Sequence, residues 1–215
     1  KTGPILSNDY LDRLPEAYII STRLAEEAGF DGIDIKACHG YLLMEAMSAF
    51  NREGKYGGSF ENRTRLLRES IAGAAFTTDL MVGFPGETEE DFQKTLDVVK
   101  EVEYDSIYTF IYSPRKGTPA AELPDPFTRQ EKQVRFDRLI ALQNEISLKK
   151  HNEYVGKTFR VLVDGSTVQS GEYNLTSRTD GGRLVHIKGP ESLIGSYVEV
   201  EVDSAATWAV FGHIK

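Results

Sequence analysis

Cysteine is almost absent from this chain of 215 residues, which contains only Cys38. A single thiol cannot form an internal disulfide. By itself it also cannot hold an iron–sulfur cluster, which generally needs three or four thiolate ligands. The composition therefore argues against a disulfide-stabilised secreted domain, and we expect no metal site in this chain.

Long apolar runs are missing as well. No segment approaches the roughly 20 residues that a membrane helix needs, and the first residues lack the apolar stretch of a signal peptide. We therefore expect no membrane association and a cytoplasmic location. Hydrophobic residues make up 40% of the chain and charged residues 27%, which is ordinary for a globular protein with one large or two modest domains.

An excess of positive charge is also lacking, since the formal net charge is −8. This charge argues against a protein that coats nucleic acid non-specifically, because such binding depends on neutralising phosphates with Lys and Arg. Basic residues do gather locally between Arg129 and Lys150. They form either a basic face for a partner or the solvated face of a helix.

The first part of the chain has the pattern of an α/β protein. Asn8 or Asp9 can cap a helix that stops at Gly29. Strand-like runs follow at residues 32–35, 78–83 and 106–112, and Thr88 caps a helix between the last two. The order helix, strand, helix, strand, helix, strand implies a parallel sheet with helical crossovers.

The remainder changes character after a proline-rich segment at residues 113–127. Thr128 and Glu131 match a capping box that opens a long helix. Short strand-like runs then follow at residues 158–163, 183–187, 196–202 and 207–214, separated by glycine-containing turns. This spacing predicts a small all-β barrel or sandwich. We expect Trp208 to face its core, because a lone tryptophan in a strand usually packs inward.

Residues 77–92, which include Gly83-Phe84-Pro85-Gly86, and residues 110–120 resemble the radical SAM methylthiotransferases that modify tRNA adenosines. The resemblance continues through residues 142–147 and ends in what looks like a TRAM domain closing at residues 207–212. It implies a partial (β/α) TIM-type barrel followed by an OB-like TRAM barrel, with tRNA as the partner. The implied reaction adds a methylthio group to N6-isopentenyladenosine near the anticodon.

The same resemblance implies S-adenosyl-L-methionine and two 4Fe-4S clusters as cofactors. The cysteines that hold the clusters in that family have no counterpart here, so we expect this chain alone to be inactive. The part of the SAM pocket that it implies falls on the ends of two strands. The candidate cofactor-binding residues are Gly83, Pro85, Gly86, Tyr112, Ser113 and Arg115. Without the resemblance, Gly-Phe-Pro-Gly is only a tight turn.

The β-rich tail also carries candidates for RNA contact. Arg and Lys can pair with phosphates, and aromatic rings can stack on bases of looped RNA. The alternative is a barrel with ordinary surface charges. The candidate RNA-binding residues are Tyr173, Arg178, Arg183, His186 and Lys188.

Residues 25–43 and 56–65 are similar instead to the NADH:flavin oxidoreductases of the old yellow enzyme family. That family folds as a complete (β/α) barrel around FMN and places a His-x-x-His or His-x-x-Asn pair over the flavin. Lys36 and His39 occupy these positions here, as candidates to donate hydrogen bonds to an oxyanion. Alternatively, Lys36 is exposed and His39 is bonded within a loop. The family's other FMN contacts lie on strands that are absent, so we do not expect bound FMN.

These segments predict four parts, namely a flavin-oxidoreductase-like barrel segment at residues 1–73, a radical SAM barrel segment at 74–127, a linking helix at 128–152 and a TRAM-like barrel at 153–215. Three β/α units are too few to close a barrel, so we expect a missing N-terminal portion or a second chain to cover the sheet edges. Two alternatives to the methylthiotransferase tail remain. One is an RNA-binding module that acts only through the TRAM-like domain, and the other is a fragment of an FMN-dependent NADH:flavin oxidoreductase.

Overall fold

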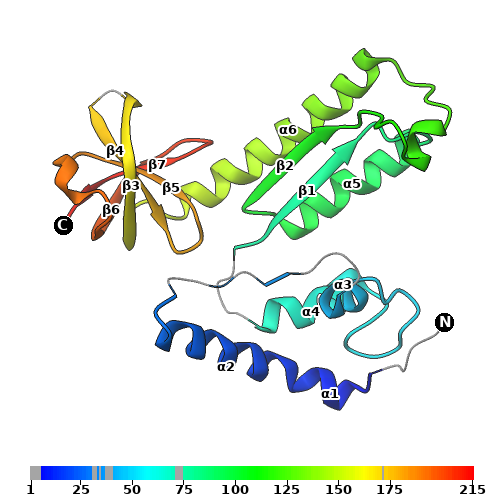
Figure 1. Ribbon diagram of the computed structural model, residues 1–215, viewed down its shortest axis with the longest axis horizontal. Helices are drawn as coiled ribbons and strands as arrows, with labels where there is room; N and C mark the ends of the chain where they lie inside the picture. The colour runs from blue at the N-terminus through cyan, green and yellow to red at the C-terminus, as the bar shows by residue number, and fades with distance from the viewer. Residues whose placement is uncertain (1–5, 31–32, 34, 37–40, 71–74, 171) are drawn as a thin grey trace. The chain divides into compact units, whose positions relative to one another are not determined.

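The computed structural model describes residues 6–30, 33, 35–36, 41–70, 75–170 and 172–215 (Figure 1). The chain divides into two compact units, residues 1–74 and residues 75–215. Each is described by itself. The expected junction at Gly73 lies outside the described residues.

The first unit contains four helices in its described part, α1 (Asn8–Asp12), α2 (Leu14–Glu27), α3 (Leu42–Met47) and α4 (Phe60–Ser70). The predicted N-terminal helix is thus broken in two at Arg13. Its cap is Ser7, whose side chain accepts a hydrogen bond from the Tyr10 amide, and not Asn8 or Asp9 as expected. The predicted stop at Gly29 is confirmed by its positive φ of 87°, a conformation that favours glycine.

A small core holds this unit together. Leu11, Leu43, Tyr56 and Leu66 are buried, and the Tyr56 hydroxyl donates to an Asp12 carboxylate oxygen at 2.7 Å. None of the residues of α2 is buried. The strand expected at residues 32–35 falls largely on residues outside the described part.

The second unit begins with a two-stranded parallel sheet, β1 (Thr77–Val82) and β2 (Ser106–Ile111), joined through α5 (Glu89–Val102). The pairing runs in register from Thr77 opposite Ser106 to Val82 opposite Ile111. Both predicted strands and the predicted crossover helix are confirmed. Thr88 caps α5, and Asp91 completes a reciprocal capping box with it.

Within the second unit, as far as its residues are described, one face of this sheet is covered and the other is not. Leu80 and Ile107 pack against a buried cluster contributed by β1, α5 and α6 (Arg129–Asn152), and Figure 1 shows both helices on one side of the strands. On the other face, Met81, Tyr108 and Phe110 are each more than half exposed. Parallel sheets are usually covered on both faces. A proposed function therefore has to explain why this apolar face of the β1–β2 sheet is exposed.

A proline-rich connection with one short helix, η1 (Pro119–Glu122), leads from β2 to α6. The predicted capping box at the start of α6 is confirmed, since Thr128 Oγ1 accepts from the Glu131 amide while the Glu131 carboxylate accepts from the Thr128 amide. Lys132 pairs with Asp125 and so ties the connection to the helix.

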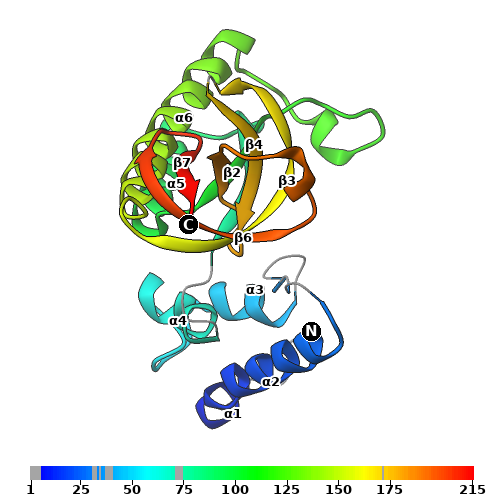
Figure 2. The same ribbon diagram turned by 90° about the vertical axis from the view of Figure 1, so that its left-hand side faces the viewer.

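After α6 comes a closed five-stranded barrel. Its elements are β3 (Thr158–Ser170), β4 (Tyr173–Thr179), β5 (Leu184–Ile187), η2 (Glu191–Leu193), β6 (Tyr197–Ala205) and β7 (Val210–Ile214). The spatial order is β3-β4-β5-β7-β6, and all pairs are antiparallel except β5 with β7. Figure 2 looks at this barrel from one side. A small barrel of five strands is the architecture of OB folds.

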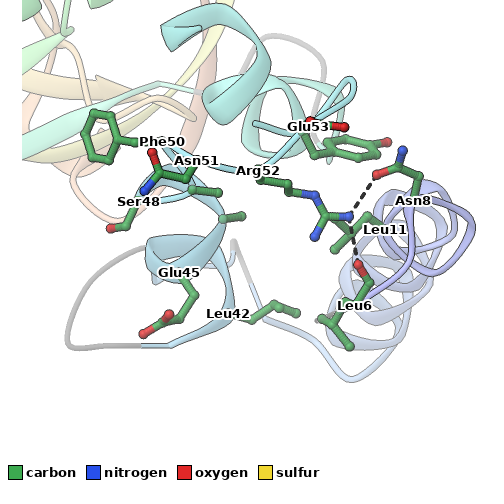
Figure 3. Close-up of a pocket in the computed structure, with 13 residues that line it drawn as sticks. Leu6, Asn8, Leu11, Leu42, Glu45, Ser48, Phe50, Asn51, Arg52 and Glu53 are labelled. Carbon is green, nitrogen blue, oxygen red and sulfur yellow. Dashed lines mark hydrogen bonds between the residues drawn. The ribbon is translucent and has the colours of Figure 1, made fainter. Parts of the chain in front are cut away.

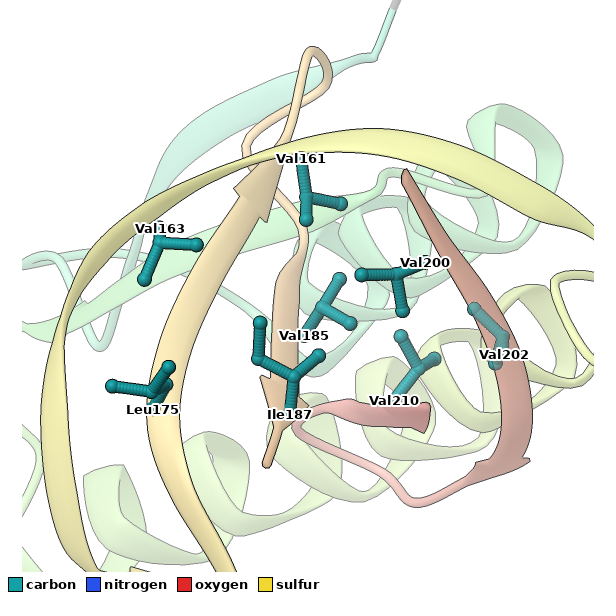
Figure 4. Packing of buried hydrophobic residues seen from close by; sticks show 8 residues of the cluster. All are labelled: Val161, Val163, Leu175, Val185, Ile187, Val200, Val202 and Val210. Carbon is teal, nitrogen blue, oxygen red and sulfur yellow. The ribbon is translucent and has the colours of Figure 1, made fainter. Parts of the chain in front are cut away.

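The interior of the barrel is filled mainly by valine. Eight fully buried residues from all five strands meet there (Figure 4), namely Val161, Val163, Leu175, Val185, Ile187, Val200, Val202 and Val210. Branched side chains suit such an interior, because inward positions alternate with outward ones along each strand. The predicted small β-barrel is thus confirmed. The predicted partial TIM-type barrel is not confirmed, since the described residues show only the two-stranded β1–β2 sheet in that part of the chain.

Two expectations about the barrel are wrong. Strand β4 was not predicted, because its inward positions include Ser177 and Thr179 as well as Leu175, and small hydroxyl residues conceal the alternation. Trp208 does not face the core, since 67% of it is exposed to solvent.

Candidate functional site

The first group of candidate residues lies together where β1 and β2 end. The Gly83 amide donates to Glu87 Oε2 at 2.8 Å. Gly83 has a positive φ of 72°, and a Cβ at this position would lie 2.6 Å from Cγ of Lys132. This turn therefore needs glycine for its backbone angle and for its close contact with α6.

The remaining cofactor candidates occupy the same edge of the sheet. Tyr112 is buried, and its ring meets Phe84 edge-on at 5.0 Å between centroids. Its hydroxyl has no hydrogen-bond partner among the described residues. Pro85 is buried in the turn, while Gly86, Ser113 and Arg115 are exposed. The structure thus gathers all six candidates at the carboxyl ends of two adjacent strands.

An ion pair beneath this edge was not anticipated from the sequence. Arg135 Nη1 lies 2.6 Å from Glu87 Oε2 and also donates to the Glu87 carbonyl oxygen at 2.9 Å. Both side chains are nearly buried, at 10% and 12% exposure. The Arg135 guanidinium also stacks over the Phe127 ring at 4.5 Å. The Arg135–Glu87 pair holds the carboxylate that accepts the hydrogen bond from the Gly83 amide. Because its two partners are 48 residues apart, no local sequence pattern indicates this pair.

Asp105 forms a joint between the β/α part of the second unit and the barrel. Its Oδ1 contacts Arg183 Nη2 at 2.7 Å and Lys150 Nζ at 3.0 Å, and its Oδ2 accepts from the Phe76 amide at 2.8 Å. The Arg183 guanidinium stacks over the ring of Tyr154 at 4.6 Å. Arg183 was expected at the RNA surface, but it lies buried at this joint, and we leave it out of that surface below.

His151 completes the joint at the end of α6. Its Nδ1 lies 2.5 Å from the Ala206 carbonyl oxygen, in the connection between β6 and β7. Because a carbonyl oxygen only accepts, Nδ1 must carry the proton in this contact. Burial lowers the pKa of His151 from its usual 6.5, and the hydrogen bond to Ala206 opposes that shift. The neutral ring is thus the form that the folded protein favours.

A pH dependence of stability follows from this shift. The unfolded chain binds a proton at His151 more readily than the folded chain, so the stabilisation is complete above about pH 6.5 and is lost as the pH falls below it. Urea unfolding between about pH 7.5 and pH 5 measures this loss, and His151→Gln should flatten the profile. An equally steep profile in the variant would assign the loss to other groups. His186, whose pKa is also lowered by burial, should keep part of the slope.

The outer face of the barrel brings three aromatic rings together. Phe211 lies 5.1 Å from Tyr173 and 5.3 Å from His186 between ring centroids, and the histidine ring stacks on it at 23°. Thr176, His186 and Phe211 form one row across β4, β5 and β7. Two of the three rings were predicted, and Phe211 was missed because its partners are 25 and 38 residues away in the sequence.

The predicted basic residues flank these rings. Arg178, on β4, and Lys188, just after β5, are both exposed. The Arg178 guanidinium is oriented by Asp164 at 3.0 Å and by the Gly182 carbonyl oxygen at 3.2 Å. Charged groups beside flat rings are what a nucleic-acid surface requires, because phosphates and bases alternate along the strand.

The flavin-like candidates are only partly visible. Lys36 Nζ lies 5.0 Å from the centre of the Tyr41 ring, whereas His39 lies outside the described residues. The described lining of the pocket in the first unit, about 950 Å³ in volume, does not include Lys36 (Figure 3). Arg52 crosses this pocket and donates to the Leu6 carbonyl oxygen at 2.7 Å and to Asn8 Oδ1 at 2.8 Å. Its guanidinium therefore ties the segment after α3 to the start of α1.

Two family profiles match the chain. The profile of the NADH:flavin oxidoreductase / NADH oxidase family matches residues 5–105, and that of the TRAM domain matches residues 152–215. The first match covers the segment for which a flavin-oxidoreductase resemblance was predicted and extends to the start of β2. The second coincides with the closed barrel.

Curated relatives were found as well. A tRNA-2-methylthio-N(6)-dimethylallyladenosine synthase from Bacillus subtilis is 47% identical over 150 residues, which is 70% of this chain and 29% of the relative. The synthase from Anoxybacillus flavithermus is 47% identical over 206 residues, 96% of this chain and 37% of the relative. That from Thermoanaerobacter sp. is 47% identical over 148 residues, 69% of this chain and 31% of the relative.

Over most of its length this chain is homologous to these synthases. The predicted resemblance to tRNA methylthiotransferases with a TRAM domain is therefore confirmed. The chain spans about a third of the length of the curated relatives it matches. The Anoxybacillus alignment also reaches into the first unit, since it leaves only 4% of the chain uncovered.

The cofactors of this family fit the chain unequally. A 4Fe-4S cluster needs several thiolates, and the sequence offers one cysteine, so the donor set does not fit a cluster. Within the described ranges, no three His, Cys, Asp or Glu side chains gather as a metal site would require. Among the described residues of the site, no contact supports binding of FMN.

No helix in the described part is long and apolar enough to cross a membrane.

Proposed function

We propose that this chain is the C-terminal portion of a radical SAM methylthiotransferase that modifies N6-isopentenyladenosine in cytoplasmic tRNA. We also propose that it contributes an RNA-binding surface on the barrel, called the RNA grip below. The observation that carries the proposal is the closed barrel with three clustered rings, Tyr173, His186 and Phe211, on its outer face. Small barrels of this architecture bind oligonucleotides across a sheet face and its flanking loops. The synthase homology supplies the substrate class.

The chain lacks the ligands for the clusters, so we propose that it does not catalyse the reaction alone. S-adenosyl-L-methionine, when bound by the complete enzyme, supplies the reactive group. We assign part of its pocket to Gly83, Pro85, Gly86, Tyr112, Ser113 and Arg115. Three features at one sheet edge support this assignment. They are the tight turn with buried Gly83 and Pro85, the exposed Arg115, and the Tyr112 hydroxyl, which has no hydrogen-bond partner among the described residues. The turn brings backbone close to any ligand there, and the guanidinium suits a carboxylate.

The uncovered face of the β1–β2 sheet supports a further part of the proposal. Met81, Tyr108 and Phe110 expose apolar surface that a parallel sheet normally buries. We propose that a missing N-terminal portion or a second chain covers this face and completes a (β/α) barrel. A second candidate function is an RNA-binding module acting only through the barrel. It is favoured by the fact that the barrel is closed whereas the β1–β2 sheet is not.

Binding of a tRNA anticodon stem-loop to the full chain tests the RNA grip. Arg178→Ala and Lys188→Ala should each weaken binding and lower the slope of log K against log salt by roughly one, because each removes one phosphate contact. Fluorescence anisotropy of a labelled stem-loop over a salt series measures both quantities.

Lys100→Ala is the matched control, since it removes one exposed positive charge from the end of α5, remote from the barrel in sequence. It should leave the salt slope unchanged. An equal loss in all three variants would indicate a general charge effect, and no binding by the unmodified chain would contradict the proposed grip.

A further inference from the structure

Trp208 has a large apolar side chain that is exposed to solvent. It is 67% exposed, although 20 hydrophobic residues of the described chain are buried. A single exposed apolar residue is normal on a protein surface and needs no explanation by itself. What distinguishes Trp208 is the way in which its backbone is held.

Trp208 lies at the tip of a tight turn between β6 and β7. The Ala206 amide donates to the Ala209 carbonyl oxygen at 2.8 Å, and Ala205 pairs with Val210 just below. The Ala206 carbonyl oxygen accepts from His151 Nδ1 of α6. Ala209, beside the tryptophan, is buried. The turn is therefore anchored on both sides while the indole projects from it.

The turn also occupies the position of a loop that contacts oligonucleotides in OB folds. In OB folds, the loop between the fourth and fifth strands flanks the face that binds oligonucleotides. The β6–β7 turn is that loop here, because β6 and β7 are the fourth and fifth strands of this barrel. Phe211, in the aromatic cluster, follows Trp208 by three residues, a span of about 10 Å in extended chain.

We propose that Trp208 stacks on an unpaired base of a single-stranded or looped RNA, next to the bases held over Tyr173, His186 and Phe211. This inference rests on the proposed RNA grip and extends it to a residue outside the β4–β5 face. An indole on an anchored turn suits the task, since little backbone freedom is lost on stacking and every base offers a flat face. The anchoring by His151 fixes the position of the turn before RNA arrives.

The experiment uses the fact that Trp208 is the only tryptophan in the chain. Intrinsic tryptophan fluorescence of the full chain therefore reports on this side chain alone. An anticodon stem-loop should quench the emission, whereas a fully paired duplex of the same length should not, because its bases are already stacked. Trp208→Ala should weaken stem-loop binding about fivefold or more, the equivalent of about 1 kcal/mol for one stacked base. Trp208→Phe should retain most of the affinity.

The outcomes separate the two proposals. If the stem-loop binds without quenching and Trp208→Ala binds as tightly as the unmodified chain, the stacking role is overturned while the RNA grip stands. If the unmodified chain does not bind the stem-loop at all, both the stacking role of Trp208 and the RNA grip are overturned. Emission that changes with protein concentration and not with RNA would assign Trp208 to a protein contact and would also overturn the inference. Because the side chain is exposed, both variants should unfold at the same urea concentration as the unmodified chain, which the same samples verify.

Discussion

Replacing Asp105 by alanine is expected to lower the free energy of unfolding of the second unit by about 3–5 kcal/mol, the usual cost of removing one partner from a buried ion pair. The side chains of Asp105 and Arg183 are 16% and 6% exposed, so solvent screens their attraction only weakly. Without the carboxylate, Arg183 is left as a buried charge. The Phe76 amide also loses its acceptor.

Urea unfolding followed by circular dichroism measures the loss. Asp203→Ala is the control, because Asp203 pairs with His213 at the surface, where both side chains are about half exposed. Surface pairs are worth about 0–1 kcal/mol. A loss at Asp105 as small as that at Asp203 would show that the joint does not hold the barrel to α6. Arg183→Met should cost less than Asp105→Ala, since it removes the charge and keeps apolar contact with Tyr154.

The joint also shows where reasoning from the sequence reached its limit. Local signals were sufficient for the helix cap at Thr88 and the capping box at Thr128, because all their partners lie within three residues. Arg183 was assigned to RNA because of the residues near it in sequence. Its actual partner is 78 residues away, and no local pattern indicates such a contact.

The barrel was predicted with the same mixture of success and failure. Regular turns and apolar runs were enough to identify most strands, whereas β4 was hidden by the buried Ser177, whose hydroxyl donates to the Val185 carbonyl oxygen at 2.9 Å. A buried polar side chain needs a hydrogen-bond partner, and the partner of Ser177 lies on another strand, β5. Trp208 was misplaced for a different reason, since a lone tryptophan in a strand usually packs inward, and only the fold shows that this one lies exposed in a turn.

At the candidate cofactor edge, Gly83→Ala is expected to destabilise the second unit by about 2–5 kcal/mol. Two costs combine. A side chain at positive φ costs about 1–2 kcal/mol, and overpacking of a filled site costs about 1–3 kcal/mol. The added Cβ would lie 2.6 and 2.7 Å from Cγ and Cδ of Lys132, whose amine is tied to Asp125 and cannot simply swing away.

Gly86→Ala separates these two costs. Gly86 is in the same turn, with a similar φ of 88°, but nothing lies within 4 Å of the position that its Cβ would take. It should therefore show only the conformational cost, about 1–2 kcal/mol, and the difference between the variants in urea unfolding isolates the contact with Lys132. Equal losses would mean that α6 yields to the new methyl group. In that case the turn would be mobile against α6. The contacts that join Gly83 to Glu87 and Glu87 to Arg135 would then not keep the carboxyl ends of β1 and β2 rigid for a ligand.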